Sequence, residues 1–322
     1  MKYLLAAPTD SEQATYFAKI STADIFTTSR GTAALQRSDG TEWSAEELIA
    51  MQFSYVKGLA EDLAGEKVTD VIVTVPPFYS QFERDAVADA IEISGLRTLA
   101  LIHDGTAIAV NYAMTRSFPE PEYHVIYDAG ASSTRATVVK FTSDGKTKNA
   151  ATQIQVMGVG YDRVVGGTEL DRRLRDILVE EFNGKHKRDI RSDPRGMAKL
   201  WKEAGRVKAI LSANTEAAST VSSLFIHHDS KLTRMIGKVE SLAFDIDFRA
   251  KIKRSTFEST CSDLTSHYTA PVWDALYNSG LTMENITSVI LAGGASRTPM
   301  IQSAVKLAVG ECVLNIVYAI ID

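Results

Sequence analysis

The stretch Tyr127-Asp128-Ala129-Gly130-Ala131-Ser132-Ser133-Thr134 says most about the fold of this 322-residue chain. An apolar run precedes it and a β-rich run, Thr134–Phe141, follows it, so the sequence predicts two strands joined by a tight turn. The turn consists of very small residues, which let backbone N–H groups approach a bulky anion, and Asp128 stands beside them to order a hydrated cation. This arrangement is typical of a hairpin that grips a phosphate. An ordinary tight hairpin stays open as the alternative for these eight residues alone, because short motifs often occur by chance.

The composition is ordinary for a globular protein, with 45% hydrophobic and 23% charged residues. The length predicts two lobes or domains rather than one core. The net charge of −5 gives no electrostatic sign of nucleic-acid binding. No apolar run approaches the ~18–20 residues that span a bilayer, so we expect no membrane partner. The two cysteines, Cys261 and Cys312, predict packed thiols rather than a disulfide framework.

Regular periodicity begins after residue 40, because residues 1–40 carry few periodic signals. Ser44 and Glu47 form a capping box that opens a helix, and Gly65 ends it. The apolar positions of this helix recur at helical spacing and predict a buried face: Leu48, Met51, Tyr55, Leu59 and Leu63.

Strands and helices then alternate. The continuous β-branched run Val71–Val75 predicts a strand buried on both faces. A second capping box, Ser80 with Glu83, opens the next helix, and a strand over 96–102 and a helix over 106–114 follow. This alternation indicates an α/β lobe with a mixed or parallel sheet.

The second half continues in the same way. One helix follows Gly166-Gly167-Thr168, and Asp193 caps a long helix that begins at the next residue. Residues 221–254 are β-like, Ser255 with Glu258 predicts another capped helix, and residues 288–292 predict a buried strand.

Three further groups of residues are candidates for ligand binding. Gly293-Gly294-Ala295-Ser296-Arg297 joins a strand to a helix, whose free N–H groups and positive dipole end suit a phosphate, and Arg297 would add charge or stack on a base. A plain turn stays open as the alternative there. Gly166-Gly167 also precedes a predicted helix, so it is a candidate phosphate-binding turn for the same reason. A plain turn stays open as the alternative there too. Lys208 and Ser212 share one helix face, which alone is more typical of a solvated surface.

Several common sites are excluded by the sequence. It contains no GxxxxGK[ST] loop, no GxGxxG after a strand, and no GxSxG or HExxH motif. The adjacent His227 and His228 point to opposite sides of a strand, which argues against a metal site. Asp104 follows a predicted strand, where it places a carboxylate at the edge of a sheet.

Taken in order, the motifs resemble the nucleotide-binding domain of the seventy-kilodalton heat-shock chaperones. The resemblance runs from about Trp43 to Gly310, and it is carried by segments that are similar to the family's signatures. These segments are Val73–Tyr79 ("TVPAYF"), Asp128–Thr134 (the second phosphate hairpin), Gly166–Asp171 ("GGEDFD") and Gly293–Pro299 ("GGSTRIP"). Lys208 and Ser212 fall where the family contacts adenosine.

The resemblance implies an α/β, two-lobed, actin-like ATPase fold of the ribonuclease H-like type, with an incomplete first lobe. It also implies four subdomains: residues 1–43 as the remnant of the outer first-lobe part, 44–117 as the inner first-lobe part, 118–165 with 265–322 as the inner second-lobe part, and 166–264 as the outer second-lobe part.

The implied ligands are ATP or ADP with Mg²⁺, the metal being held through water near Asp128 and not by direct ligands. The implied catalytic residues are Asp128 and Asp104. The implied nucleotide-binding residues are Gly130, Ala131, Ser132, Ser133, Gly166, Gly167, Lys208, Ser212, Gly293, Gly294 and Arg297.

One branch of the family is most similar. Asp104–Ala107, the serine-rich turn after Asp128, Gly158–Arg163 and Leu211–Asn214 resemble the large 170-kilodalton glucose-regulated, or hypoxia up-regulated, chaperones and their fungal counterparts. This resemblance implies an ATP-binding co-chaperone of the endoplasmic-reticulum lumen. It would hold unfolded polypeptides and act as nucleotide-exchange factor for the lumenal seventy-kilodalton chaperone, in a stress response. No signal peptide is recognised in the chain, so the lumenal location rests on the resemblance.

The departures from the family's motifs predict a very low rate of ATP hydrolysis. The family's first phosphate hairpin, "GIDLGTT", and the lysine after it have no counterpart here, and the closing helix and substrate-binding domain are also absent, so we expect a chain truncated at both ends. Arg135 stands where the family has an acidic residue, and Ala209 where an arginine stacks on adenine. Losing one preorganised charged group typically costs ~10²–10³ in rate, so we expect almost no hydrolysis. We also expect exposed apolar surface around Val71–Val75.

Two alternatives stay open for the function. One is a degenerate, non-hydrolysing interaction module that engages a partner chaperone through outer helices such as Met197–Leu211. A weaker one is a sugar kinase of the same fold, for which no catalytic-base aspartate stands in a sugar-site context.

Overall fold

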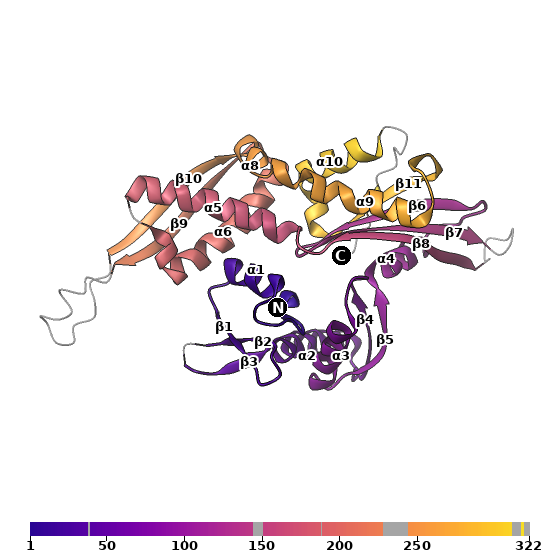
Figure 1. Ribbon diagram of the computed structural model, residues 1–322, viewed down its shortest axis with the longest axis horizontal. Coiled ribbons are helices and arrows are strands. Elements are labelled where there is room, and N and C mark those ends of the chain that lie inside the picture. Colours follow the sequence, from indigo (N-terminus) through magenta and orange to yellow (C-terminus); the bar gives the residue numbers. More distant parts are fainter. Residues whose placement is uncertain (38, 144–150, 188, 228–243, 311–316, 319–322) are drawn as a thin grey trace, which may run out of the picture. The chain divides into compact units, whose positions relative to one another are not determined.

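The computed structural model describes residues 1–37, 39–143, 151–187, 189–227, 244–310 and 317–318. The chain divides into two compact units (Figure 1). Unit 1 comprises Met1–Gly167, Ser266–Ser296 and Ile301–Asp322, and unit 2 comprises Thr168–Thr265 with Arg297–Met300. In the part of the chain that is described, no helix is both long and apolar enough to cross a membrane.

The largest sheet of unit 1 has five strands in the order β12-β11-β6-β7-β8. Their bounds are β6 Glu122–Ala129, β7 Thr134–Ser143, β8 Thr152–Asp162, β11 Ser288–Ala292 and β12 Val317–Tyr318. β6, β7 and β8 form antiparallel hairpins, so the two strands predicted around Asp128 are confirmed. β11 runs parallel to β6, with Ser288 opposite His124 and Ala292 opposite Asp128.

Helices pack on this sheet because successive side chains of a strand point to opposite faces. Ile126 lies in one cluster with Ile108 of α4 (Asp104–Ala113), whereas the hydroxyl of the next residue, Tyr127, donates to the carbonyl of Tyr268 over 3.0 Å. Tyr268 belongs to α9 (Thr265–Ser279). The helices α4 and α9 therefore contact opposite faces of the sheet, through the adjacent residues Ile126 and Tyr127 of β6.

Two glycines of β8 let α9 come unusually close. A Cβ on Gly160 would lie 2.1 Å from the carbonyl oxygen of Pro271, and one on Gly158 would lie 2.4 Å from that of Ala275. Real Cβ atoms do not reach such distances, so any side chain at either position would push the helix away. The Gly-Val-Gly sequence therefore serves helix–sheet packing.

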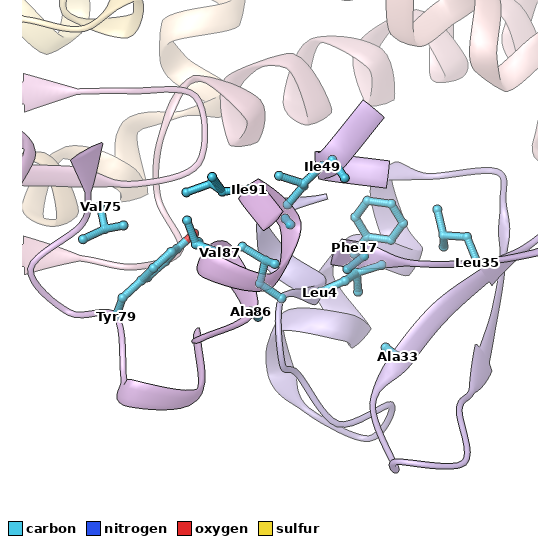
Figure 2. Close-up of a cluster of buried hydrophobic side chains, with 14 of the residues drawn as sticks. Leu4, Phe17, Ala33, Leu35, Ile49, Val75, Tyr79, Ala86, Val87 and Ile91 are labelled. Atoms are coloured by element: carbon cyan, nitrogen blue, oxygen red, sulfur yellow. The ribbon is translucent and has the colours of Figure 1, made fainter. Parts of the chain in front are cut away.

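A separate hydrophobic cluster lies in the N-terminal part of unit 1 (Figure 2). Phe17, Ile49 and Ile91, from three different helices, are among its buried members. The contributing strands and α-helices are α1 Glu12–Ile20, β1 Asp24–Thr27, β2 Ala33–Gln36, α2 Ala45–Ala64, β4 Asp70–Val75, α3 Gln81–Ile93 and β5 Arg97–His103, whereas β3 Glu42–Ser44 gives no member. β1, β2 and β3 form an antiparallel sheet, and β4 and β5 form a parallel pair.

The predicted helix caps are confirmed where they are local. Ser44 Oγ accepts from Glu47 N at 3.2 Å while the Glu47 carboxylate accepts from Ser44 N at 2.8 Å, and Gly65 ends the helix at φ 70°. Ser80 and Glu83 make the same reciprocal pair at the start of α3. Each capping box satisfies two backbone donors that the first helical turn leaves free.

Two other regions differ from what the sequence signals indicate. Residues 1–40, which carry few periodic signals, contain α1 and the first two strands of a sheet, and these strands of four residues are too short to give a clear period. The predicted Ser255 cap is wrong, because α8 (Arg254–Thr260) already begins at Arg254 and follows Lys253 without a side-chain cap.

Apolar surface is exposed on α2, β4 and β5. Ile72 and Leu99 are 56% and 59% exposed, so the prediction of apolar surface around Val71–Val75 is confirmed, and the prediction of burial on both faces is wrong. The predicted core face of α2 is largely exposed too, with Leu63 at 92%. The helix buries its neighbouring stripe at Ile49 and Ala50 instead. A two-stranded parallel sheet offers one covered face where such sheets normally have two.

We predict that this surface drives self-association. Replacing Ile72 and Leu99 together by lysine should lower the fluorescence of a bound hydrophobic dye by roughly half or more and reduce concentration-dependent sedimentation. Thr74→Lys, an exposed change on the same strand, is the control and should leave both unchanged. Equal dye binding by the double variant and the unaltered protein would contradict the prediction.

Unit 2 combines two long helices with an antiparallel strand pair. Its elements are α5 Gly167–His186, α6 Pro194–Ala213, β9 Glu216–His227, β10 Phe244–Lys253 and α8. The Asp193 carboxylate accepts from Arg195 N at 3.0 Å, which confirms the predicted N-cap. Within the β-like region predicted over 221–254, residues 228–243 lie outside the described residues.

Cys261 is a free, buried thiol, as predicted, whereas Cys312 lies outside the described residues. Burial raises the pKa of Cys261 to about 12. Near pH 8 only ~10⁻⁴ of such a thiol is ionised, and the thiolate is the reactive form. With Cys312→Ser in place, we predict that a thiol reagent reacts with Cys261 at least ~100-fold more slowly in the native protein than in denaturant. Equal reaction rates in the native and the denatured protein would show that the Cys261 thiol is accessible in the native fold.

Candidate functional site

The turn between β6 and β7 consists of residues 130–133. Gly130 N donates to the carbonyl of Ser133 over 3.0 Å and closes the turn. The segment before α5 is hydrogen-bonded to it, because Gly167 N donates to the carbonyl of Gly130 at 2.9 Å and Thr134 Oγ1 donates to that of Val165 at 2.8 Å. The structure therefore brings the predicted Gly166-Gly167 pair beside the predicted phosphate hairpin.

The turn offers backbone donors to a ligand. Among the described residues, the N–H groups of Ala131 and Ser132 have no hydrogen-bond acceptor in the protein. Ala131 is exposed and Ser132 is half-buried, whereas Ser133 is buried. Consecutive free N–H groups in a turn of small residues form a concavity that suits an anion such as a phosphate.

Two of the predicted glycines make room for the hairpin itself. A Cβ on Gly166 would lie 2.6 Å from the carbonyl oxygen of Ala131. A Cβ on Gly293, whose φ is 78°, would lie 2.4 Å from Asp128 Oδ1. A Cβ on Gly294 would meet no atom within 4 Å, so that position is open. Gly166 and Gly293 thus let the segments before α5 and after β11 pack closely against the turn. Gly294, in contrast, has open space where a side chain would stand.

Arg135 joins the two predicted catalytic residues. This side chain of β7 forms ion pairs with Asp128 at the end of β6 and with Asp104 at the start of α4. All three side chains are nearly buried, with exposures of 12–15%. Arg135 Nε is also buried, and it has no acceptor in the described part of the chain. Buried donors without an acceptor are rare in native proteins, so this one requires a specific explanation.

The charge of Asp104 depends on this arrangement. Burial raises the pKa of Asp104 above its ordinary value, the Arg135 guanidinium opposes that shift, and the Asp128 carboxylate adds to it. A second bond, from Gly105 N to Asp104 Oδ1 at 2.8 Å, also favours the charged form. Arg135 is therefore the main group that keeps this buried carboxylate ionised.

The remaining predicted residues lie in or next to unit 2. On α6, Lys208 Nζ lies 2.8 Å from Asp171 Oδ1, and the Ser212 hydroxyl donates to the carbonyl of Lys208 at 3.0 Å. Arg297 is exposed at the end of the 3₁₀ turn Gly294–Arg297. The side chains of Lys208 and Ser212 are thus held within their own unit, and their role as adenosine contacts stays a prediction.

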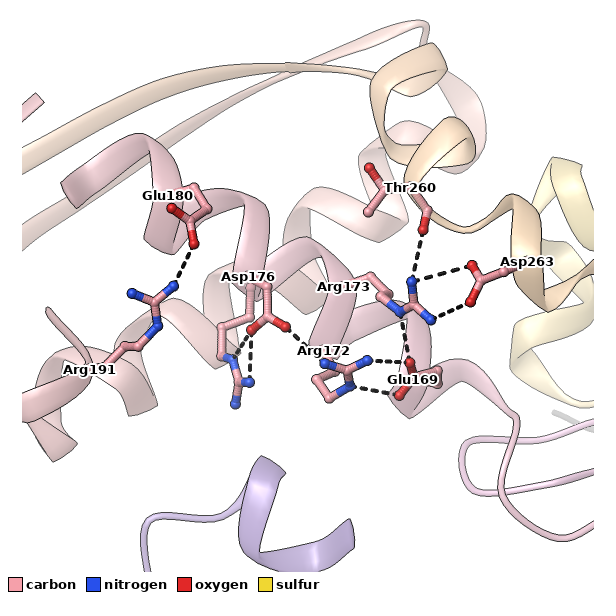
Figure 3. A network of polar contacts seen from close by, with 9 residues as sticks. Glu169, Arg172, Arg173, Asp176, Glu180, Arg191, Thr260 and Asp263 are labelled. Atoms are coloured by element: carbon pink, nitrogen blue, oxygen red, sulfur yellow. Dashed lines mark hydrogen bonds and ion pairs between the residues drawn. The ribbon is translucent and has the colours of Figure 1, made fainter. Parts of the chain in front are cut away.

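A network of arginines and carboxylates lies on α5 of unit 2 (Figure 3). Buried Glu169 accepts from Arg172 and Arg173, and Arg173 also contacts Asp263 at 2.7 Å and the carbonyl of Thr260 at 3.0 Å. These bonds tie the first turn of α5 to the segment after α8. The network fixes the helix that follows the Gly166-Gly167 turn.

Comparison with protein families matches residues 1–316 to the family described as "Hsp70 protein". This chain belongs to the Hsp70 family. It has the actin-like ATPase fold of that family, which binds ATP and ADP, so the predicted family and fold class are confirmed.

The names of the curated relatives refer to hypoxia and to heat shock. The chain is 42% identical to "Hypoxia up-regulated protein 1" of Xenopus laevis over 88% of this chain and 42% of that protein. It is 38% identical to the protein of the same name from Homo sapiens over 89% of this chain and 28% of that protein. It is 41% identical to "Heat shock protein 70 homolog lhs1" of Schizosaccharomyces pombe over 83% of this chain and 30% of that protein. The chain spans less than half the length of these relatives.

The predicted magnesium ion does not fit the Hsp70-family hairpin of this chain. Asp104 and Asp128 each give one carboxylate oxygen to Arg135, which already supplies a positive charge between them. Across the described ranges, no group of three or more His, Cys, Asp or Glu side chains is placed to ligate a metal ion directly, a finding that does not bear on the water-mediated ion that the sequence predicts. A metal at this point would have to displace the guanidinium.

Sequence reasoning found the turns of this site but missed the partners of its charged groups. Arg135 was predicted only to weaken hydrolysis, and Asp171 was not expected beside Lys208. The short turn between β6 and β7 gives a partial signal for one of these contacts. It sets Arg135 opposite Asp128 in the hairpin, where two such side chains can form an ion pair. No sequence signal of that kind links Asp171 to Lys208.

Proposed function

We propose that this chain is the ATP- and ADP-binding domain of a large Hsp70-family chaperone of the endoplasmic-reticulum lumen. In this proposal the chaperone assists the folding of unfolded polypeptides and acts as nucleotide-exchange co-chaperone for the lumenal seventy-kilodalton chaperone. The observation that carries the nucleotide part is the turn at 130–133, whose free N–H groups face no protein acceptor in the described residues. The relatives' names support the stress-chaperone part.

The hairpin would hold the polyphosphate through its backbone. N–H groups of Ala131 and Ser132 would donate to phosphate oxygens, and small side chains leave those donors accessible. Gly294, which has open space before it, would let the loop after β11 approach the same ligand. Lys208, Ser212 and Arg297 are proposed to contact the nucleoside. The four predicted subdomains are part of the same proposal.

We propose that hydrolysis is very weak. A guanidinium that bridges Asp104 and Asp128 favours the charged form of both carboxylates, which makes them weaker bases toward water. The chain would therefore bind nucleotide without turning it over at a useful rate.

The hairpin proposal predicts a charge-sensitive affinity. Ser132→Asp places a negative charge beside the phosphates, and repulsion of about 1–2 kcal/mol should weaken ADP binding roughly tenfold or more, as measured by calorimetry. Ser54→Asp, the same change at an exposed position of α2, is the control and should bind ADP as the unaltered protein does. Absence of any binding heat with ADP or ATP in the unaltered protein would end the nucleotide proposal.

A second candidate function is a non-hydrolysing module that docks on a partner chaperone. The observation that favours it is the outer face of α6. Leu200, Val207 and Leu211 are buried, whereas the exposed positions include four basic residues, Arg195, Lys199, Lys202 and Arg206, the last of which pairs with Glu203 at 2.6 Å. A row of positive charge suits a partner surface that carries acidic side chains.

This second function predicts that reversing charge on α6 slows nucleotide exchange in the partner. Arg195→Glu with Lys202→Glu should reduce the accelerated release of labelled ADP from the lumenal seventy-kilodalton chaperone by about tenfold at low salt. Lys306→Glu, at an exposed position of α10 (Pro299–Val309), is the matched control. Unchanged acceleration by the double variant would place the docking surface elsewhere.

A further inference from the structure

The position expected to organise a metal ion is occupied by a cation that belongs to the chain. Arg135 reaches Asp104 and Asp128 with its two terminal nitrogens, one nitrogen to each carboxylate. The three residues come from α4, β6 and β7, so three separate elements fix the guanidinium in place. A guanidinium whose two terminal nitrogens are each bound to a carboxylate has a fixed position, unlike the mobile guanidinium of a surface arginine.

The geometry leaves little room for exchange with a hydrated ion. Mg²⁺ requires near-octahedral oxygen ligands at ~2.0–2.1 Å and keeps several of its waters. The other oxygen of Asp104 accepts from Gly105 N at 2.8 Å, and Asp128 Oδ1 lies against Gly293. A Cβ on Gly130 would approach Arg135 Nη2 to 3.2 Å, so the turn also closes on the guanidinium.

The charges favour the same conclusion. Two carboxylates and one guanidinium leave one net negative charge, and the guanidinium is permanently ionised at any physiological pH. A phosphate bound by the N–H groups of the turn would meet that fixed cation in the adjoining strand. Arg135 thus already neutralises one of the two carboxylate charges that a divalent ion would otherwise neutralise.

We propose that Arg135 replaces the divalent cation at this hairpin, so that the chain binds the polyphosphate of ADP or ATP without magnesium. This inference rests on the proposed nucleotide binding and deepens it, since it defines the ligand as the metal-free nucleotide. The proposed site therefore differs from one that binds the nucleotide only as its magnesium complex.

The first measurement is the affinity of the full chain for ADP, by calorimetry, in excess Mg²⁺ and in excess chelator. We expect the two dissociation constants to agree within about threefold, because no metal contributes to the site. Arg135→Ser should bind ADP more weakly in chelator than in Mg²⁺ by about tenfold or more, since two carboxylates then face the phosphates unless a metal neutralises them. Arg37→Ser, which removes a largely exposed arginine, is the control and should behave as the unaltered protein.

The second measurement needs no nucleotide. Manganese alone is titrated into the protein and free Mn²⁺ is followed by electron paramagnetic resonance. The unaltered chain should bind no ion at this site, Arg135→Ser should gain one, and Arg135→Ser with Asp128→Asn should lose it again. If Arg135→Ser does not fold, as circular dichroism would show, the two measurements on the unaltered chain still decide.

The outcomes are distinguishable. ADP binding by the unaltered chain that requires Mg²⁺, or a tight Mn²⁺ ion in that chain, would overturn the inference and leave the proposed nucleotide function standing. No ADP binding under either condition would overturn the nucleotide function and the metal-free ligand with it, while a Mn²⁺ site that appears only in Arg135→Ser would still support Arg135 as the resident cation.

Discussion

The parallel pairing of β11 with β6 brings the turn after β11 against the hairpin between β6 and β7. Its register sets Ala292 beside Asp128, so the chain leaving β11 must turn at Gly293 against the phosphate hairpin. A buried hydrogen bond between His124 and Ser288 fixes the other end of the same ladder at 2.7 Å. Because these residues are 164 apart in sequence, only the ladder brings the two turns together. A shift of one residue would turn Asp128 to the opposite face of the sheet.

Arg135 then determines what that geometry can do. A turn with free N–H groups favours an anion, but both carboxylates beside it are bound to a guanidinium. Recognition of a phosphate and activation of water make different demands, since the first needs donors and the second needs a free base. The hairpin of this chain meets the first demand. The proposed binding without turnover would give the nucleotide a structural or signalling role.

Local signals made part of this structure predictable. The capping boxes at Ser44 and Ser80 need only residues three apart, and the motif at Asp128 gives both its strands and its turn. Burial was less predictable, because Val71–Val75 has the composition of a covered strand and yet pairs with β5 alone. Arg135 is the clearest case. Its type was visible in the sequence, but its two partners come from other elements, and one of them is 31 residues away.

Two hydrophobic clusters in the described part of unit 1 share no residue, one within Leu4–Leu96 and one that links α4 with β6, β7 and β11. Each cluster can lose its packing while the other keeps its own, so hydrogen exchange should reveal two levels of protection within this single unit. A single melting temperature would then be an average over two transitions and not a property of the chain. The phosphate hairpin belongs to the second cluster's sheet, so its persistence on heating would follow that cluster and not the first.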